Sequence, residues 1–144
     1  MFFKVCGMTR QQDLDIASEL GFAVSGFIFH PRSPRNVEAR QVRSLESGRM
    51  LKAGVFVEQN AQEILKTVEL AHLDLVQVHG KQDAQCLKEL ADALGRERIV
   101  RVVWPESHAG RKGLLDCIES CAPYCGMVLL DAGSGGGGHG TGIP

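Results

Sequence analysis

The side chains able to do chemistry in this sequence lie where short apolar runs end. The residues that follow these runs are polar, reactive or glycine: Cys6-Gly7, His30, Glu58, His79-Gly80, Trp104 and Asp131. If the runs are parallel strands closed into a barrel, their carboxyl ends surround one active site. In an open, doubly wound sheet, mainly the residues at the switch point would meet. The distribution therefore favours a barrel with a single site built from residues far apart in the sequence.

The cysteines raise the separate question of a metal site. Cys117, Cys121 and Cys125 are spaced four residues apart, but Pro123 would end a helix between the last two. No histidine lies at a zinc-knuckle spacing, and no fourth ligand is identified. We therefore predict core and surface thiols and no metal ion. The five cysteines of the chain are an odd number that matches no secreted disulfide framework, which favours reduced thiols in the cytoplasm.

Residues 133–142 form a glycine-rich stretch that resembles a phosphate-binding loop in composition. It lacks the Lys-Ser/Thr ending of a P-loop and does not open an evident helix. We expect residues 133–144 to be a mobile loop or tail.

The elements that would position the reactive residues alternate between strand and helix at intervals of about 25 residues. The predicted strands are residues 2–6, 24–29, 53–57, 73–79, 99–104 and 127–131, and the predicted helices are residues 13–20, a weaker one through Val42 and Leu45, 61–70, 84–93 and 114–120. Runs this apolar suit strands buried on both faces of a parallel sheet. The predicted fold class is α/β, either a doubly wound sheet or a (β/α)₈ barrel of the TIM type, and the spacing and strand ends favour the barrel.

Length and composition limit what the chain can be. We expect its 144 residues to form a single domain, residues 1–144, with about six βα units and the last two units of a barrel missing. A net charge of −1 offers no field for nucleic acid or an anionic membrane, and no apolar run approaches the length of a membrane span. The short N-terminal apolar run lacks the leading positive region of a signal peptide.

Several of these segments resemble one enzyme family, phosphoribosylanthranilate isomerase. The motifs that carry the resemblance are residues 4–10 (KVCGMTR), 26–35 (GFIFHPRSPR), 54–57 (GVFV), 76–80 (VQVHG), 129–131 (LLD) and 138–142 (GHGTG). They cover essentially the whole chain in the family's order. His30 stands where the family usually has tyrosine, and His139 replaces or accompanies a glycine of the family's Gly-Gly-Thr-Gly loop. Family members continue into two further βα units, which carry the phosphate site.

The resemblance implies an isomerase of tryptophan biosynthesis. Its reaction converts N-(5′-phosphoribosyl)anthranilate to 1-(2-carboxyphenylamino)-1-deoxyribulose 5-phosphate by an Amadori rearrangement, without metal or cofactor. By the family's pattern Cys6 is the general base and Asp131 the general acid, and Arg35 holds the anthranilate carboxylate. We expect Gly7 and His79 to line the substrate site. Without the resemblance, Cys6 would be read as a small core residue, Asp131 as a turn or cap residue and Arg35 as a solvated loop charge.

Other readings stay open at this point. One is another phosphosugar barrel such as indole-glycerol-phosphate synthase, although no predicted strand ends in the lysine acid it would need. A second is a non-catalytic barrel fragment that self-associates, or is complemented by the missing units, through open sheet edges. The third is a doubly wound nucleotide-binding domain. With the phosphate site absent, we expect this chain by itself to be inactive or nearly so.

Overall fold

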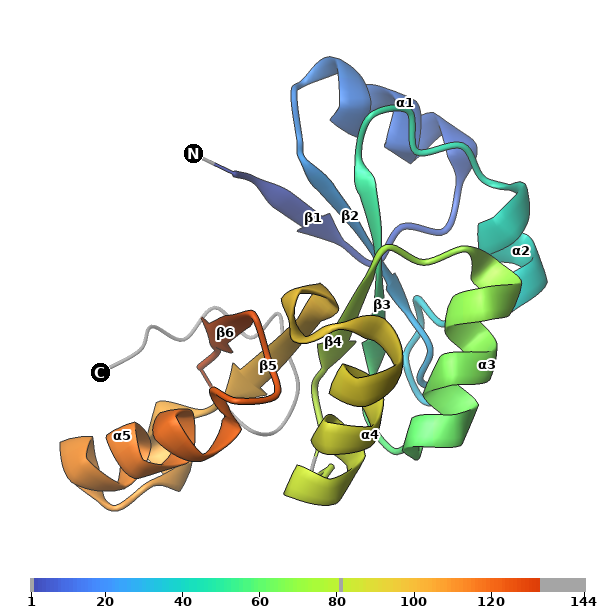
Figure 1. Ribbon diagram of the computed structural model, residues 1–144. Coiled ribbons are helices and arrows are strands. Elements are labelled where there is room, and N and C mark those ends of the chain that lie inside the picture. The colour runs from blue at the N-terminus through green and yellow to red at the C-terminus, as the bar shows by residue number, and fades with distance from the viewer. Residues whose placement is uncertain (1, 81, 133–144) are drawn as a thin grey trace. The chain divides into compact units, whose positions relative to one another are not determined.

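The computed structural model describes residues 2–80 and 82–132 (Figure 1). The chain divides into two compact units, Met1–Gln82 and Asp83–Pro144, called here the N-terminal and C-terminal units. Strands and helices alternate in both units and lie at the positions predicted from the apolar pattern. The glycine-rich residues 133–144 lie outside the described part, so the expected mobile tail stays a prediction, as does the single domain over 1–144.

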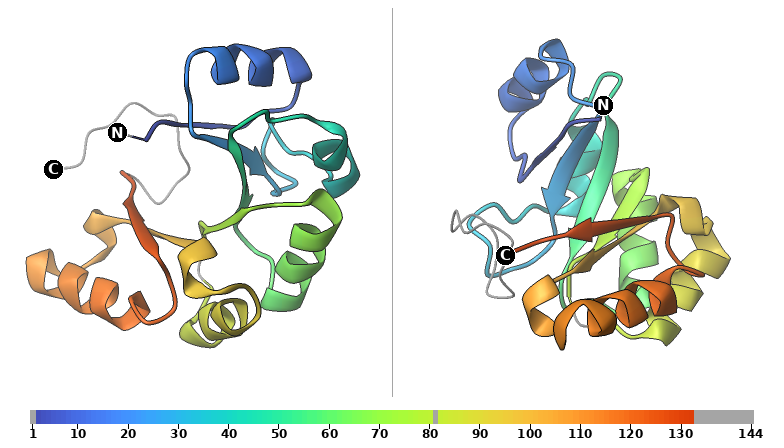
Figure 2. Two further views of the ribbon diagram at one scale, coloured as in Figure 1. Left: turned by 45° about the horizontal axis from the view of Figure 1, so that its top comes forward. Right: turned by 90° about the vertical axis from the view of Figure 1, so that its left-hand side faces the viewer.

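The N-terminal unit is a parallel sheet of four strands joined by three helices. Its elements in chain order are β1 (Lys4–Cys6), α1 (Gln11–Glu19), β2 (Val24–Ile28), α2 (Ala39–Ser44), β3 (Leu51–Phe56), α3 (Ala61–Ala71) and β4 (Leu75–Val78). The strands lie in the order β1-β2-β3-β4, and every pairing is parallel. Figure 2 shows α1, α2 and α3 on the same side of these strands.

This arrangement excludes a doubly wound sheet in the N-terminal unit. A doubly wound sheet reverses its strand order at a switch point and has helices on both faces. Here the order is sequential and the three helices share one face, as in the wall of a βα barrel. The alternative of a doubly wound nucleotide-binding domain is therefore wrong for this unit.

The alternation of side chains along each strand separates two faces of this sheet. On one face, Phe27, Phe56, Val76 and Val78 are fully buried. Each helix adds a large, fully buried side chain to the same core: Leu14 of α1, Val42 of α2 and Ile64 of α3. The opposite face carries Cys6, which pairs in register with Gly26. The helix-covered face thus forms the core between the sheet and its helices. The other face carries Cys6 at its carboxyl end, and its residues Ala53, Val55 and Leu75 are buried as well.

Local sequence signals set the ends of the helices. At the start of α3, Asn60 accepts a hydrogen bond from the Glu63 backbone N–H at 3.0 Å, and the Glu63 carboxylate accepts one from the Asn60 N–H at 2.9 Å, which is a capping box. At the end of α2, the Lys52 ammonium of β3 donates to the carbonyls of Val42 at 2.9 Å and Leu45 at 2.5 Å. Burial lowers the pKa of Lys52.

The C-terminal unit repeats the βα pattern on a smaller scale. It contains α4 (Ala84–Leu94), a short 3₁₀ turn (Arg96–Arg98), β5 (Ile99–Val103), a second 3₁₀ turn (Pro105–Ser107), α5 (Gly110–Cys121) and β6 (Met127–Leu130). Strands β5 and β6 are parallel neighbours. Helix α5 begins four residues before the predicted start at Leu114, because its polar first turn carries no apolar period.

Candidate active site

Cys6 is the last residue of β1, where the strand gives way to a tight turn. The backbone N–H groups of Gly7 and Met8 both donate to the carbonyl of Gly26 on β2, at 2.9 and 3.0 Å. Gly7 has a φ of +87°, a region that favours glycine. The turn thus ends β1 at Cys6 and leaves this half-buried side chain at the carboxyl end of the sheet.

Arg35 lies across this turn, although it comes 28 positions after Gly7 in the chain. Its Nη1 donates a hydrogen bond of 3.2 Å to the carbonyl oxygen of Cys6. A methyl group on Gly7 would lie 2.6 Å from Arg35 Cδ and 2.7 Å from Nη1. The side chain of Arg35 therefore needs the space that a glycine at position 7 leaves. Three predicted site residues, Cys6, Gly7 and Arg35, are brought into direct contact.

The loop that carries Arg35 is held by its own hydrogen bonds. The Ser33 hydroxyl accepts a bond from the Arg35 N–H at 3.2 Å, and the Ser33 carbonyl accepts one from the Asn36 N–H at 3.0 Å. Asn36 then forms a parallel bridge with Ile28 at the end of β2. Because the loop is anchored to β2 beside β1, the exposed guanidinium of Arg35 is positioned over Cys6 while it stays open to a ligand. A fixed guanidinium suits planar, bidentate recognition of a carboxylate.

His79 follows β4 in the same sheet. Its backbone N–H donates to the Phe56 carbonyl at 2.8 Å, and its Nδ1 lies 3.1 Å from Nε2 of Gln77. Gln77 is only 4% exposed, and its Oε1 is buried without a hydrogen-bond partner among residues 2–80 and 82–132. The strand register runs from Cys6 through Gly26 and Ala53 to Leu75, which lies two residues before Gln77. Gln77 is therefore on the same face of the sheet as Cys6.

Asp131 belongs to the C-terminal unit, where it follows β6 directly. Its N–H donates to the Val103 carbonyl of β5 at 3.1 Å, which continues the pairing of the two strands by one residue. The residue is half-buried. Its place at the carboxyl end of a parallel strand is equivalent to that of Cys6 on β1, as the sequence predicted.

Three residues that support the candidate site were not predicted as site residues from the sequence, although Lys4 and Gly26 lie in the motifs that carry the family resemblance. Gln59, after β3, accepts hydrogen bonds from the N–H groups of Val57 and Glu58 through its Oε1, both at 3.1 Å, and donates from Nε2 to the Phe29 carbonyl. It thereby ties the ends of β2 and β3 together. The Cys6 thiol and the Lys4 ammonium both lie near the space left by the missing side chain of Gly26, which depends on the pairing of β1 with β2. None of these contacts is visible from composition or spacing.

The other cysteines lie in the C-terminal unit, where Cys121 and Cys125 contact each other. Cys121 and Cys125 are buried, with their sulfur atoms 3.8 Å apart, and Cys117 is half-buried. Burial raises the pKa of Cys117, and raises the pKa of Cys125 to about 11. No group of three or more His, Cys, Asp or Glu side chains with the arrangement of a metal site occurs within residues 2–80 and 82–132. Cys121 and Cys125 are thus core residues, and the expectation that no metal ion binds here stays a prediction.

None of the helices in the part of the chain that the structure describes is both long enough and apolar enough to cross a bilayer.

Comparison with known proteins gives a consistent result over the whole chain. The family model of N-(5′-phosphoribosyl)anthranilate (PRA) isomerase matches residues 3–143. The N-(5′-phosphoribosyl)anthranilate isomerase of Desulfovibrio desulfuricans is 50% identical over 141 residues, which are 98% of this chain and 65% of the relative. That of Maridesulfovibrio salexigens is 42% identical over 140 residues, 97% of this chain and 66% of the relative. The chain thus spans slightly less than two thirds of the length of these relatives.

Solved structures show the same fold. The phosphoribosylanthranilate isomerase of Thermotoga maritima superposes with a TM-score of 0.79 at 21% identity, over 98% of this chain and 67% of that protein. The enzyme of Thermus thermophilus gives a TM-score of 0.75 at 26% identity, over 92% of this chain and 62% of that protein. These likenesses confirm the predicted α/β fold of the TIM-barrel type. By the family match and the identity to its curated relatives, the chain belongs to the N-(5′-phosphoribosyl)anthranilate isomerase family.

Proposed function

We propose that this protein acts in the isomerisation of N-(5′-phosphoribosyl)anthranilate to 1-(2-carboxyphenylamino)-1-deoxyribulose 5-phosphate, a step of tryptophan biosynthesis. The observation that carries the proposal is the contact of Arg35 with Gly7 and Cys6, which joins an anion-binding group to a thiol at the carboxyl end of β1. Membership of the isomerase family supports the same reaction. One structural neighbour is a PRA isomerase in complex with the reduced form of the product.

The reaction requires one acid and one base. Protonation of the ribose ring oxygen breaks the bond between that oxygen and C1′, and opens the sugar to an iminium ion. Removal of the C2′ proton then places its electron pair into a C1′–C2′ double bond, which gives an enolamine that tautomerises to the ketone. In our proposal Asp131 supplies the first proton and the Cys6 thiolate removes the second. Such proton transfers each contribute about 10²- to 10⁴-fold to a rate.

The remaining site residues bind rather than react. Arg35 would pair with the anthranilate carboxylate, because its guanidinium is exposed and anchored to the Cys6 carbonyl. Gly7 gives Arg35 its space. His79 would line the substrate site, with its ring oriented by Gln77. We further propose a cytoplasmic location, which the five free thiols support because disulfides are rare there.

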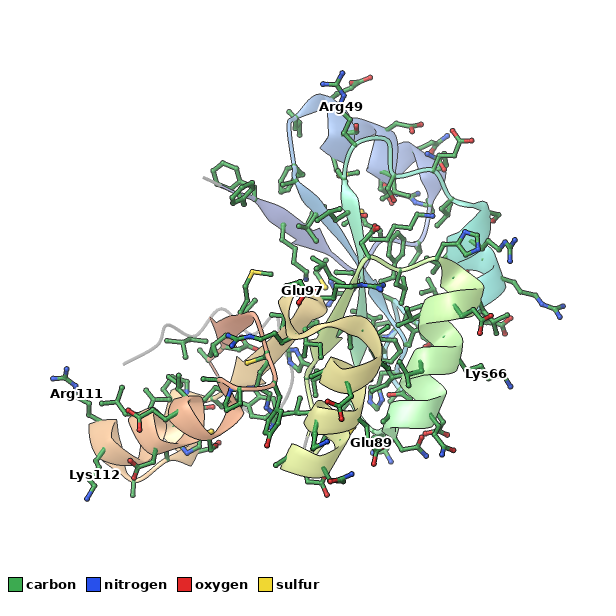
Figure 3. All side chains as sticks on the ribbon, in the orientation of Figure 1. Arg49, Lys66, Glu89, Glu97, Arg111 and Lys112 are labelled. Carbon is green, nitrogen blue, oxygen red and sulfur yellow. The ribbon has the colours of Figure 1, made fainter. Side chains whose placement is uncertain are left out.

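Binding of the reduced product tests the substrate class without requiring turnover. We expect calorimetry to detect binding to the 144-residue chain, and Arg35→Met to weaken it at least tenfold, since a charge-assisted hydrogen bond contributes about 1.5–3 kcal/mol. Arg49→Met is the matched control, because Arg49 is exposed and extends away from the ribbon (Figure 3). Equal affinity in Arg35→Met and Arg49→Met would contradict the assignment of Arg35.

A second proposal concerns association through the edge of β1. In the described residues β1 pairs only with β2, and it is preceded by Phe2 and Phe3, whose exposed fractions are 91% and 56%. An apolar, unpaired strand edge promotes association with another chain. We propose self-association, or complementation by further βα units, at this edge. Sedimentation at several concentrations should give a mass that rises with concentration and falls in Phe2→Ser; a constant monomer mass would contradict self-association.

A further inference from the structure

Lys4 and Cys6 lie on the same face of β1, because side chains two residues apart in a strand point to the same side. Both side chains are half-buried. In register, Lys4 pairs with Val24 of β2 and Cys6 with Gly26. The lysine therefore belongs to the face of the sheet that carries the candidate site, and not to the helix-covered core.

The missing side chain of Gly26 brings the two groups together. A methyl group on Gly26 would lie 2.8 Å from Cys6 Sγ and 3.0 Å from Lys4 Nζ. Two atoms that close to one point are at most 5.8 Å apart. Gly26 is buried in the middle of β2 and does not have a positive φ. A side chain is therefore disfavoured at this position because Cys6 and Lys4 occupy the space, and not because of the backbone conformation.

The Lys4 ammonium makes no hydrogen bond or ion pair with any residue among 2–80 and 82–132. Lys52, by contrast, donates to two backbone carbonyls, and Lys88 pairs with Asp92 at 2.6 Å. A half-buried cation without an anionic partner is costly unless a negative charge forms beside it. The group next to Lys4 that can acquire such a charge is the thiol of Cys6.

We propose that Lys4 is a positioning residue for the base, whose ammonium stabilises the thiolate of Cys6. The effect of Lys4 on the thiolate is argued from the geometry alone, and only the role of that thiolate as a catalytic base rests on the proposed function. The thiol releases its proton to solvent, and the thiolate then takes the C2′ proton of the substrate and becomes a thiol again. Lys4 keeps its own protons throughout and contributes only its charge.

The other charged groups near Cys6 do not replace Lys4. Strand β2, VSGFI, has no titratable side chain. The loop after β2 brings the Arg35 guanidinium, which donates to the Cys6 backbone carbonyl and, in the proposed function, is occupied by the substrate carboxylate. Beyond Gly7, Arg10 and Asp13 neutralise each other in an ion pair of 2.8 Å. Among residues 2–80, Lys4 is therefore the cation that the position of Gly26 places beside the sulfur, whereas Arg35 contacts the backbone of Cys6.

The test is the pH dependence of Cys6 alkylation by iodoacetamide, followed by mass spectrometry of the peptide. We expect Lys4→Met to raise the pH midpoint by at least about half a unit, the effect of one charge at 5.8 Å even at the permittivity of water. Lys4→Arg, which keeps the charge, should restore the wild-type midpoint. Lys66→Met removes an exposed lysine of α3 and should leave it unchanged. Cys86, in the C-terminal unit, provides an internal reference in every sample.

An unchanged midpoint in folded Lys4→Met would overturn the inference. A midpoint that rises equally in Lys4→Met and Lys4→Arg would also overturn it, because packing rather than charge would then be responsible. If Lys4→Met does not fold, Gly26→Ala offers a second route: its methyl group must displace the sulfur, the ammonium or both, and an unchanged midpoint there would count against the proposal. Alkylation is measured without substrate, so its result is independent of whether the protein is an isomerase.

Discussion

Substitution of Gly7 by alanine perturbs both the backbone and the Arg35 contact, and a second glycine separates the two effects. Gly7 and Gly21 have similar φ values, +87° and +79°. A methyl group on Gly7 would lie 2.6 Å from Arg35 Cδ, whereas one on Gly21 would meet nothing within 4 Å. Gly21→Ala therefore imposes the backbone strain alone, and Gly7→Ala imposes the same strain and displaces Arg35.

The expected magnitudes follow from this difference. A residue with a Cβ at positive φ costs about 1–2 kcal/mol, so both variants should lose that much free energy of unfolding. Gly7→Ala should lose about 1 kcal/mol more, because the hydrogen bond from Arg35 to the Cys6 carbonyl is broken. In addition, only Gly7→Ala should bind the reduced product more weakly, by about tenfold, since the guanidinium leaves its position over Cys6.

Urea unfolding and calorimetric titration measure these two quantities on the same samples. We expect Gly21→Ala to be destabilised but to bind the reduced product as the wild type does, and Gly7→Ala to be impaired in both stability and binding. If both variants bound the reduced product equally well, Gly7 would not be needed to position Arg35, and the proposed arrangement of the site would be refuted.

Three further predictions concern stability. Ile64→Ala, which removes a fully buried side chain of α3, should cost about 2–5 kcal/mol in urea unfolding, while Lys66→Ala two residues later on the exposed surface should stay within about 0.5 kcal/mol of the wild type. Asn60→Ala removes the capping box and should cost about 1 kcal/mol, with a change below that in Asn60→Asp, which keeps a capping oxygen. Burial raises the pKa of Cys125 from 9.0 to about 11, so the native state holds a proton that the unfolded chain releases. The buried, protonated Cys125 thiol should therefore contribute its full stabilisation below pH 9 and lose it as the pH rises to about 11. If the urea midpoint of Cys125→Ala declined equally over this pH range, the pH dependence would not come from Cys125.

The order of strands and helices was predictable because each strand is a short apolar run and each helix an amphipathic stretch. The places where the prediction differs have physical causes. Helix α5 starts at Gly110 rather than Leu114, since its first turn includes the polar Arg111 and Lys112 and depends on hydrogen bonding rather than on an apolar face. Strand β4 covers only Leu75–Val78, two residues shorter at its start and one at its end than the predicted strand 73–79. The N–H groups of Asp74 and His79 still donate to carbonyls of β3, so the backbone pairing extends one residue beyond each end of the regular strand.

The candidate site was predictable as a set of separate residues but not as an arrangement. Cys6, Gly7 and Arg35 could be named from motifs, yet their contact arises because the loop after β2 folds back over β1. The position of Lys4 beside Cys6 depends on the register that places Gly26 opposite the cysteine. Such pairings are decided by tertiary packing, and no local pattern encodes them.

Loss of phosphoribosylanthranilate fluorescence reports directly on proton transfer by Cys6 and Asp131. We expect any turnover by the protein to fall by at least about 10²-fold in Cys6→Ala and in Asp131→Asn, because each variant removes one of the two proton-transfer groups. Cys86→Ala, which removes another half-buried thiol, should retain the wild-type rate. Turnover that persists in Cys6→Ala at the rate of Cys86→Ala would contradict the assignment of Cys6 as the base and, with it, the proposed site.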